Sequence, residues 1–177
     1  MPRASKQVDW CLKKAEKEIE ECRKLGKRPK HKGLLKVNPN REEANEHLRK
    51  SEENLKFATS LDSDKYGYKI VEAVFYCIYH CFLAIASKFG YESGNQTCTI
   101  SLIEYLKEEK KIDLDQKFIE MMKYNDEQKD QKHPSIIEMR EDYTYSSKIS
   151  VGKERVAKLI EICKEIVHVT KEIVYHK

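Results

Sequence analysis

The sequence predicts an all-α fold: an up-and-down bundle of four to five helices, preceded by an N-terminal helical extension. Apolar residues recur at intervals of three and four along most of the chain, as expected of helices with one buried face. No segment shows the alternation typical of a strand. Charged residues make up 36% of the chain and apolar residues 40%, with only six Gly and four Pro, a composition that favours helices. At 177 residues, the chain is long enough to bury a core.

The first expected helix covers residues 6–25, with an apolar face that includes Val8, Cys11 and Ala15. The linker KLGKRPKHKG, residues 24–33, then ends it with Gly, Pro and basic side chains. This run of cations can meet phosphate groups through counterion release, although most charge runs are simply solvated. The run consists of Lys24, Lys27, Arg28, Lys30 and Lys32. We therefore expect residues 1–32 to form an N-terminal helix and basic linker outside a bundle of residues 33–177.

The bundle is expected to begin with a helix capped by Asn40, with Glu43 completing a capping box. An acidic turn at 61–67 leads to the central helix, residues 68–89, which is apolar nearly all round and is therefore expected to be buried on most sides. Gly90 is placed to end it. Four further helices are expected around Ile100–Leu106, over 114–122, in IIEMREDYTYSS and over 151–175.

Composition also bears on location. The net charge of +4 permits contact with nucleic acid without requiring it. The N-terminus has no apolar run typical of a secretory signal. The longest uncharged stretch, residues 73–87, is shorter than the roughly 18 residues that span a bilayer. We expect a cytoplasmic protein with no membrane contact, whose six cysteines are reduced thiols.

Within the central helix, the stretch YCIYHCF places Cys77, His80 and Cys81 within five positions. A structural zinc site requires four ligands in a closed tetrahedron, and the other cysteines lack metal-like spacing. Buried free cysteines commonly pack as small apolar side chains. The stretch therefore predicts packing, with His80 as a core or interface histidine that has a hydrogen-bond partner. No metal and no cofactor are expected.

The order of elements resembles the HEPN family of helical domains. A GLL lead-in and an Asn-Pro turn precede NREEANEHLRKSEENLKFA. An aromatic helix with Phe75, Tyr76, Tyr79 and His80 follows, and then Gly90-Tyr91. The resemblance covers residues 33 to about 175 and departs from the family at 95–97, where many relatives place a Ser-His pair. It implies a homodimer and frequent pairing with a small nucleotidyltransferase in toxin–antitoxin modules.

Active HEPN members are metal-independent ribonucleases with an Arg and, four to six residues later, a His near the start of a late helix. By this resemblance Arg140 is the motif arginine, but no histidine follows it in EDYTYSS. Tyr145 stands nearby, and a tyrosine with a pKa near 10 is a poor base at neutral pH. His133 could fold back from the preceding loop. Arg41 and His47 have motif-like spacing but lie on the first bundle helix, about 120° apart.

The favoured interpretation is a non-catalytic, dimeric HEPN-type interaction module that pairs with a nucleotidyltransferase, binds nucleotide or RNA, or does both. Its expected phosphate contacts are Arg140, Lys27, Arg28, Lys30 and Lys32. One alternative is a divergent ribonuclease centred on Arg140 with Tyr145 or His133. A second is a purely structural, dimeric helical scaffold with no ligand. Arg140 itself has an alternative role in an ion pair with Asp142 or Glu138 that fixes the dimer surface. Tyr143 and Tyr145 are also candidate acceptors of AMP from a nucleotidyltransferase, although packing is the better interpretation of both.

Overall fold

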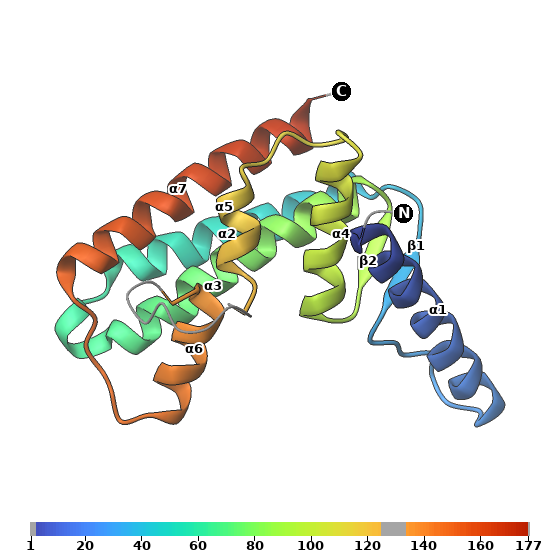
Figure 1. Cartoon of the computed structure of the whole chain (residues 1–177), viewed down its shortest axis with the longest axis horizontal. Coiled ribbons are helices and arrows are strands. Elements are labelled where there is room, and N and C mark those ends of the chain that lie inside the picture. Colours follow the sequence, from blue (N-terminus) through green and yellow to red (C-terminus); the bar gives the residue numbers. More distant parts are fainter. Residues whose placement is uncertain (1–2, 125–133, 177) are drawn as a thin grey trace.

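The computed structural model of the chain describes residues 3–124 and 134–176, and it confirms the all-α helical bundle (Figure 1). The described part contains seven helices and one small two-stranded ribbon. The helices are α1 (Arg3–Lys24), α2 (Arg41–Ser60), α3 (Ser63–Lys88), α4 (Gln96–Glu108), α5 (Gln116–Met121), α6 (Ile136–Tyr145) and α7 (Lys153–Tyr175), and the strands are β1 (Leu34–Lys36) and β2 (Tyr91–Ser93).

Helix α3 is the centre of the bundle, as its apolar sequence predicts. It packs against α2, α7, α6 and α4, and Figure 1 shows α2 and α7 running alongside it. Phe75, Ile78 and Phe82 are almost fully buried, and each such side chain contributes about 1.5–3 kcal/mol of transfer free energy. The helix begins earlier than expected, at Ser63, because Asp62 caps its first turn, and its backbone is locally non-helical at Tyr66.

The ends of α2 and α3 are joined by hydrogen bonds. The side chain of Asn40 accepts from the Glu43 N–H at 3.0 Å, which confirms the expected cap. The Asn40 N–H donates to the Ser87 carbonyl at 2.9 Å, so the cap is completed by α3. Gly90 has a φ of +74°, and a Cβ there would lie 2.5 Å from the Val37 carbonyl oxygen. This position therefore requires glycine.

The expectation that no strands form is wrong at one place. β1 and β2 pair antiparallel, with Leu34 opposite Ser93 and Lys36 opposite Tyr91. Each strand has three residues, which is too short to produce a recognisable alternation. The ribbon lies where the N-terminal segment enters the bundle and fixes the path of the chain after the basic linker.

The expectation of six reduced thiols is also wrong. Cys11 of α1 and Cys98 of α4 form a disulfide, with their Cα atoms 5.9 Å apart, and both are fully buried. The remaining four cysteines are free. The pairing arises because α1 packs directly on α4 and β1, which brings together two cysteines separated by 87 positions. The N-terminal helix is therefore docked on the bundle.

Helix α3 is the one helix of the described segments that is long and apolar enough to cross a membrane, by length and composition alone. The expectation that no segment is long enough to cross a bilayer rested on the uncharged stretch 73–87. The full helix passes the test because a membrane-spanning helix can include a few charged residues. In the structure, 72% of the apolar stretch is buried inside the protein. Its hydrophobicity is accounted for by core packing.

Candidate functional site

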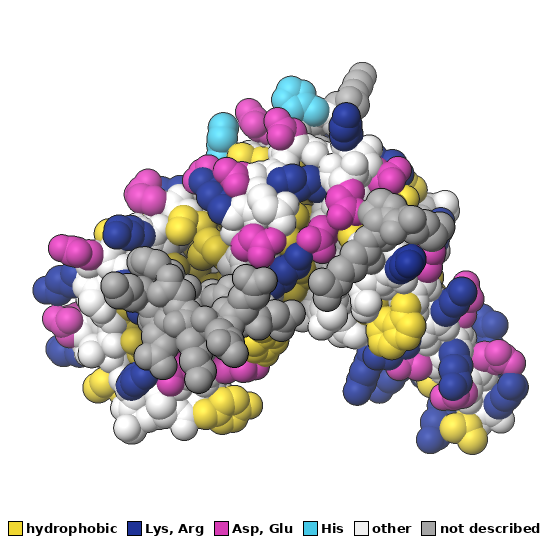
Figure 2. All heavy atoms as spheres, in the orientation of Figure 1, with side chains coloured by type: hydrophobic (Ala, Val, Ile, Leu, Met, Phe, Trp, Pro, Cys, Tyr) yellow, Lys and Arg dark blue, Asp and Glu magenta, His cyan; other side chains and the backbone are white. Residues whose placement is uncertain are grey.

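The positive charge of the chain is concentrated at its N-terminal end. Residues 1–33 contain eleven Lys and Arg against five Asp and Glu, a net charge of +6. The other 144 residues contain 23 and 25, a net charge of −2. Figure 2 shows Lys and Arg side chains gathered over α1 and the adjoining loop. We call α1 and the loop up to Gly33 the basic arm.

The loop of the basic arm is held at several points. The Lys32 N–H donates to the Glu18 carboxylate of α1 at 2.5 Å, and the Asn95 side-chain amide donates to the Lys32 carbonyl. The ring of His31, which is 7% exposed, lies 3.2 Å from the Glu92 carboxylate. These contacts fix the loop to α1, to β2 and to the start of α4. Its cations are therefore displayed on a defined backbone.

The predicted loop cations are all exposed to solvent, namely Lys27, Arg28, Lys30 and Lys32. Lys24, at the end of α1, forms an exposed ion pair with Glu20 at 2.8 Å. Such surface pairs contribute little to stability and are easily exchanged for another anion. The structure thus leaves the predicted phosphate contacts of the linker accessible to solvent.

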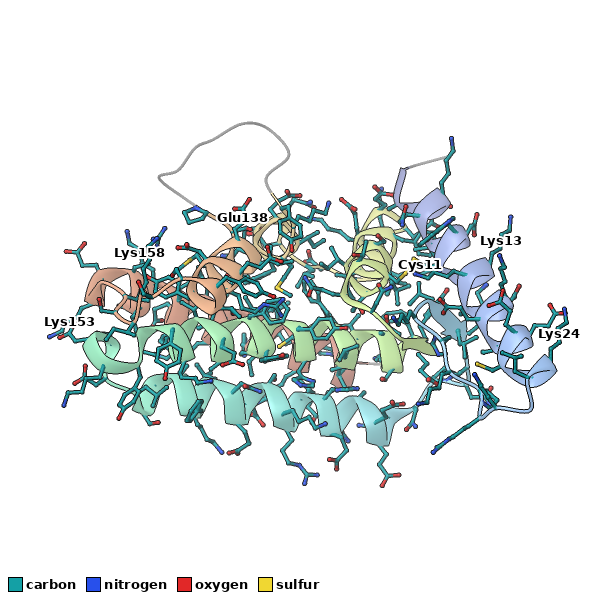
Figure 3. The ribbon with its side chains drawn as sticks, turned by 90° about the horizontal axis from the view of Figure 1, so that it is seen from below. Cys11, Lys13, Lys24, Glu138, Lys153 and Lys158 are labelled. Atoms are coloured by element: carbon teal, nitrogen blue, oxygen red, sulfur yellow. A yellow bond between two sulfur atoms is a disulfide. The ribbon has the colours of Figure 1, made fainter. Side chains whose placement is uncertain are left out.

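Arg140 does not join them. It lies on α6, and Figures 1 and 3 show α6 and α1 at different ends of the molecule. The Arg140 guanidinium carbon is 4.1 Å from the ring centroid of Phe75 in α3, a cation–π contact. Asp142, one of its two expected ionic partners, pairs with Lys148 at 2.7 Å. Arg140 therefore packs on the core of the bundle, away from the basic arm.

The segment after Arg140 was the expected place for a catalytic partner. Tyr145 is 87% exposed, so it is not part of the core of this chain, and packing at an interface stays a prediction. Tyr143 is partly buried, and its hydroxyl donates to the Ser150 carbonyl at 3.0 Å. His133 lies outside the described residues. The side chains of Arg41 and His47 have different neighbours, since Arg41 lies over the Tyr175 ring and His47 faces His80. They therefore do not form one site.

A surface cavity of about 420 Å³ lies beside this segment, between the end of α6 and the start of α3. Its two lysines already have carboxylate partners: Lys69 pairs with Glu72 at 2.9 Å and Lys148 with Asp142 at 2.7 Å. No histidine is among the described residues that line it. The described lining of this cavity therefore supplies no histidine for the proton transfer that RNA cleavage uses.

The sequence did not predict the pairing of His80 with His47. Their Nδ1 atoms are 3.0 Å apart and their rings are stacked, so one ring donates to the other when both are neutral. Burial lowers the pKa of His47 to about 4, assisted by His80 and by Lys50. Burial also lowers the pKa of His80. The prediction that His80 has a hydrogen-bond partner is confirmed.

This pair predicts a pH-dependent stability. In the unfolded chain both histidines titrate near pH 6.5. In the folded chain the pKa values of His47 and His80 are lower. The contribution of the neutral pair to the free energy of unfolding is therefore complete above pH 6.5 and is lost as the pH falls towards 4. After allowance for partial solvation, we expect His47→Gln to reduce the loss of stability between pH 7.5 and 5 by about 1–2 kcal/mol. Urea unfolding at both pH values measures this, with the exposed His168 changed to Gln as control. An unchanged pH dependence in His47→Gln would contradict the prediction.

The three candidate ligands of YCIYHCF do not converge on one point. Cys77 and Cys81 interact with each other, and Cys77 also interacts with Cys163 of α7, whereas His80 faces His47 of α2. Burial raises the pKa of the Cys81 thiol, which keeps it protonated and poorly suited to bind a metal. In the described parts of the chain, no three His, Cys, Asp or Glu side chains are grouped to hold a metal ion.

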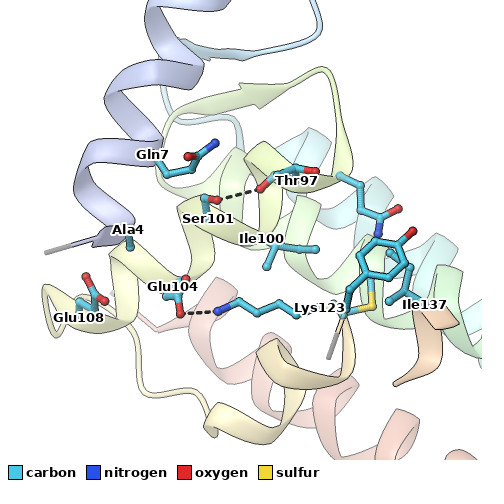
Figure 4. A pocket seen from close by; sticks show the side chains of 12 residues that line it. Ala4, Gln7, Thr97, Ile100, Ser101, Glu104, Glu108, Lys123 and Ile137 are labelled. Carbon is cyan, nitrogen blue, oxygen red and sulfur yellow. Dashed lines mark hydrogen bonds and ion pairs between the residues drawn. The ribbon is translucent and has the colours of Figure 1, made fainter. Parts of the chain in front are cut away.

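A second cavity of about 420 Å³ lies at the root of the basic arm, between α1 and α4 (Figure 4). Some of its polar groups contact one another: Glu104 pairs with Lys123 at 2.5 Å, and Ser101 donates to the Thr97 carbonyl at 2.9 Å. Gln7 and Ala4 of α1 form one wall. The cavity provides a mixed polar and apolar surface, with its lysine neutralised.

Comparison with protein-family models, with curated proteins and with solved structures finds no match. The class of protein that the structure defines is a helical bundle that carries a docked, basic N-terminal arm.

Proposed function

We propose that this protein is a non-catalytic, HEPN-type interaction module that binds RNA through the phosphate groups, using the basic arm. The observation that carries the proposal is the separation of charge, with +6 on residues 1–33 and −2 on the rest. A single-sign surface attracts a polyanion and gains affinity from the release of its counterions. The backbone of the loop is already held near both ends, since Lys32 bonds to Glu18 and Asn95 and the Lys27 N–H donates to the Cys22 carbonyl at 2.9 Å.

The absence of catalysis is supported by the surroundings of Arg140. Its guanidinium group lies on Phe75, and no described histidine lines the neighbouring cavity. The only histidines paired with each other among the described residues, His47 and His80, have lowered pKa values and lie between α2 and α3. The proposal also includes the homodimer and the nucleotidyltransferase partner that the HEPN resemblance implies.

Retention of labelled RNA tests the proposal. We expect the variant Lys27→Ala/Arg28→Ala/Lys30→Ala/Lys32→Ala to bind end-labelled tRNA and cellular RNA roughly 10- to 100-fold more weakly near physiological salt. The slope of log affinity against log salt should fall by about 3, since each contact with single-stranded RNA contributes about 0.7. Binding is measured by filter retention over a series of salt concentrations, with the RNA analysed for cleavage in parallel.

The chain offers a matched control of the same composition on α7. Lys153, Arg155, Lys158 and Lys164 are also three Lys and one Arg, and Figure 3 shows Lys153 and Lys158 at the end of the molecule away from α1. Their replacement by Ala should leave the salt slope nearly unchanged. Equal losses of RNA affinity in the loop variant and the α7 variant would indicate general charge attraction and would contradict a defined binding site on the basic arm. RNA cleavage that Arg140→Ala abolishes would show a ribonuclease instead.

A further inference from the structure

An exposed tryptophan stands on the outer surface of the basic arm. Trp10 is the only Trp in the chain, and its side chain is 52% exposed. The inner face of α1 is formed by Val8, Cys11 and Ala15, which are at most 4% exposed. Trp10 is therefore not required to dock α1 on the bundle, and a large aromatic surface remains available for a ligand.

Lysines surround this ring on the same face of the helix. Positions three, four and seven residues away from Trp10 lie beside it on the α1 surface. Lys14 has its ammonium nitrogen 5.1 Å from the ring centroid, in cation–π contact. Figure 3 shows Lys13 pointing away from the bundle. The lysines at these spacings are Lys6, Lys13, Lys14 and Lys17, and Gln7 stands at the other position three residues away.

Acidic side chains interrupt this surface only partly. Asp9 is adjacent to Trp10 in sequence, and Lys17 lies 4.0 Å from Glu21 in an exposed pair. Such pairs contribute little and are screened by salt. Beyond the end of α1, which lies about 21 Å from Trp10 at 1.5 Å per residue, the loop adds Lys27, Arg28, Lys30 and Lys32. The loop then returns along the helix, where the Lys32 N–H donates to Glu18. The cations thus continue along the arm from the aromatic ring.

We infer that Trp10 is a stacking platform for an unpaired base, which makes single-stranded RNA the substrate class of the basic arm. This inference rests on the proposed function. Proteins that bind single strands combine a positively charged track for the backbone with aromatic rings for the bases, over about 4–16 nucleotides per site. In a duplex, the bases are stacked on one another and their faces are not available to Trp10. The arm therefore discriminates between single and double strands through this ring.

A lipid surface is the competing ligand for a basic helix with a tryptophan, and the structure disfavours it. Membrane-surface helices insert a continuous apolar face. The apolar face of α1 is buried against α4 and β1. Its outer face has one aromatic ring among lysines and acidic residues. A single ring among charged side chains can stack on one base while the lysines contact the neighbouring phosphates, but it offers too little apolar surface to insert among lipid acyl chains.

The intrinsic fluorescence of the protein tests the inference directly, because Trp10 is its sole tryptophan. A single-stranded RNA 12-mer should quench the emission to saturation, and the same 12-mer annealed to its complement should change it little at equal salt. By anisotropy of labelled RNA, Trp10→Ala should bind the single strand roughly 10-fold more weakly. Trp10→Phe should retain most of the affinity, since it keeps an aromatic face.

The possible outcomes separate this inference from the proposed function. If Trp10→Ala binds single strands as wild type while the loop variant does not, the stacking platform is wrong and phosphate binding stands. Equal losses of single-stranded and duplex binding in Trp10→Ala would also overturn it. If wild-type protein retains neither RNA, both are wrong. A blue shift with anionic phospholipid vesicles, without quenching by RNA, would assign the ring to lipid and overturn it.

Discussion

Cys98→Ala is expected to lower the free energy of unfolding by about 4 kcal/mol. The Cys11–Cys98 bond closes a loop of 87 positions, and a cross-link of that span restricts the unfolded chain by about 4–5 kcal/mol in the chain-entropy description. The same bond fastens α1 to α4. The variant should therefore also expose the basic arm to limited proteolysis at enzyme concentrations that leave the wild-type arm intact.

Urea unfolding without reductant measures this loss, and Cys163→Ala is the matched control. Cys163 is a free, fully buried cysteine of α7, so its replacement removes similar packing without removing a cross-link. It should cost about 1 kcal/mol. Thiol titration of the unfolded, unreduced protein should find four thiols, and six after reduction. Six thiols without reduction would contradict the disulfide and the predicted loss.

The disulfide also bears on the expected cytoplasmic location, which remains a prediction. Disulfides persist in oxidising compartments and are rare in a reducing cytosol. The expected cytoplasmic location and the Cys11–Cys98 bond therefore favour opposite redox states for these two cysteines. Full burial of both cysteines slows attack by external thiols. The thiol count in protein isolated under thiol-trapping conditions would show which form the chain takes in its own compartment.

The helices were predictable because their signals are local. The apolar spacing of α3, the Asn40 cap and the left-handed Gly90 depend on neighbours within one or two turns. The disulfide and the His47–His80 pair depend on which distant segments meet, at separations of 87 and 33 positions. Periodicity shows that a helix has an inner face but does not show which helix that face contacts.

The candidate site was predictable to a similar extent. The cations of residues 27–32 are a local feature of the sequence, and the structure keeps them together and exposed. Arg140 was added to them as the motif arginine of the HEPN resemblance, and its contact with Phe75 follows from packing of α6 on α3. The outer face of α1 was missed because only its apolar positions were considered. The spacing of Trp10 to Lys6, Lys13 and Lys14 carries a signal that sequence alone could have revealed.

Gly33→Ala is expected to destabilise the protein by about 3 kcal/mol, because this glycine is the contact between the loop and α1. A Cβ at Gly33 would lie 2.2 Å from the Cys11 carbonyl oxygen and 2.8 Å from the Ala15 nitrogen. Both are backbone atoms of a helix held by a disulfide, so neither can move independently. The Gly33 carbonyl also accepts from the Gly94 N–H at 2.8 Å. The loop is thus closed between α1 and the ribbon.

Gly152→Ala is the control, since a Cβ at Gly152 meets nothing within 4 Å and the residue has a φ of −56°. It should change the free energy of unfolding by less than about 1 kcal/mol. Urea unfolding of both variants, with the disulfide intact, measures the two free energies of unfolding. Their difference separates the clash of a Cβ at position 33 with α1 from the effect of any Gly-to-Ala change on the chain. Equal stability of Gly33→Ala and wild type would contradict the prediction and mean that the backbone of the loop can shift to admit a Cβ at Gly33. The loop would then be fixed by the bonds of Lys32 to Glu18 and Asn95, and the position of its cations would depend on those bonds.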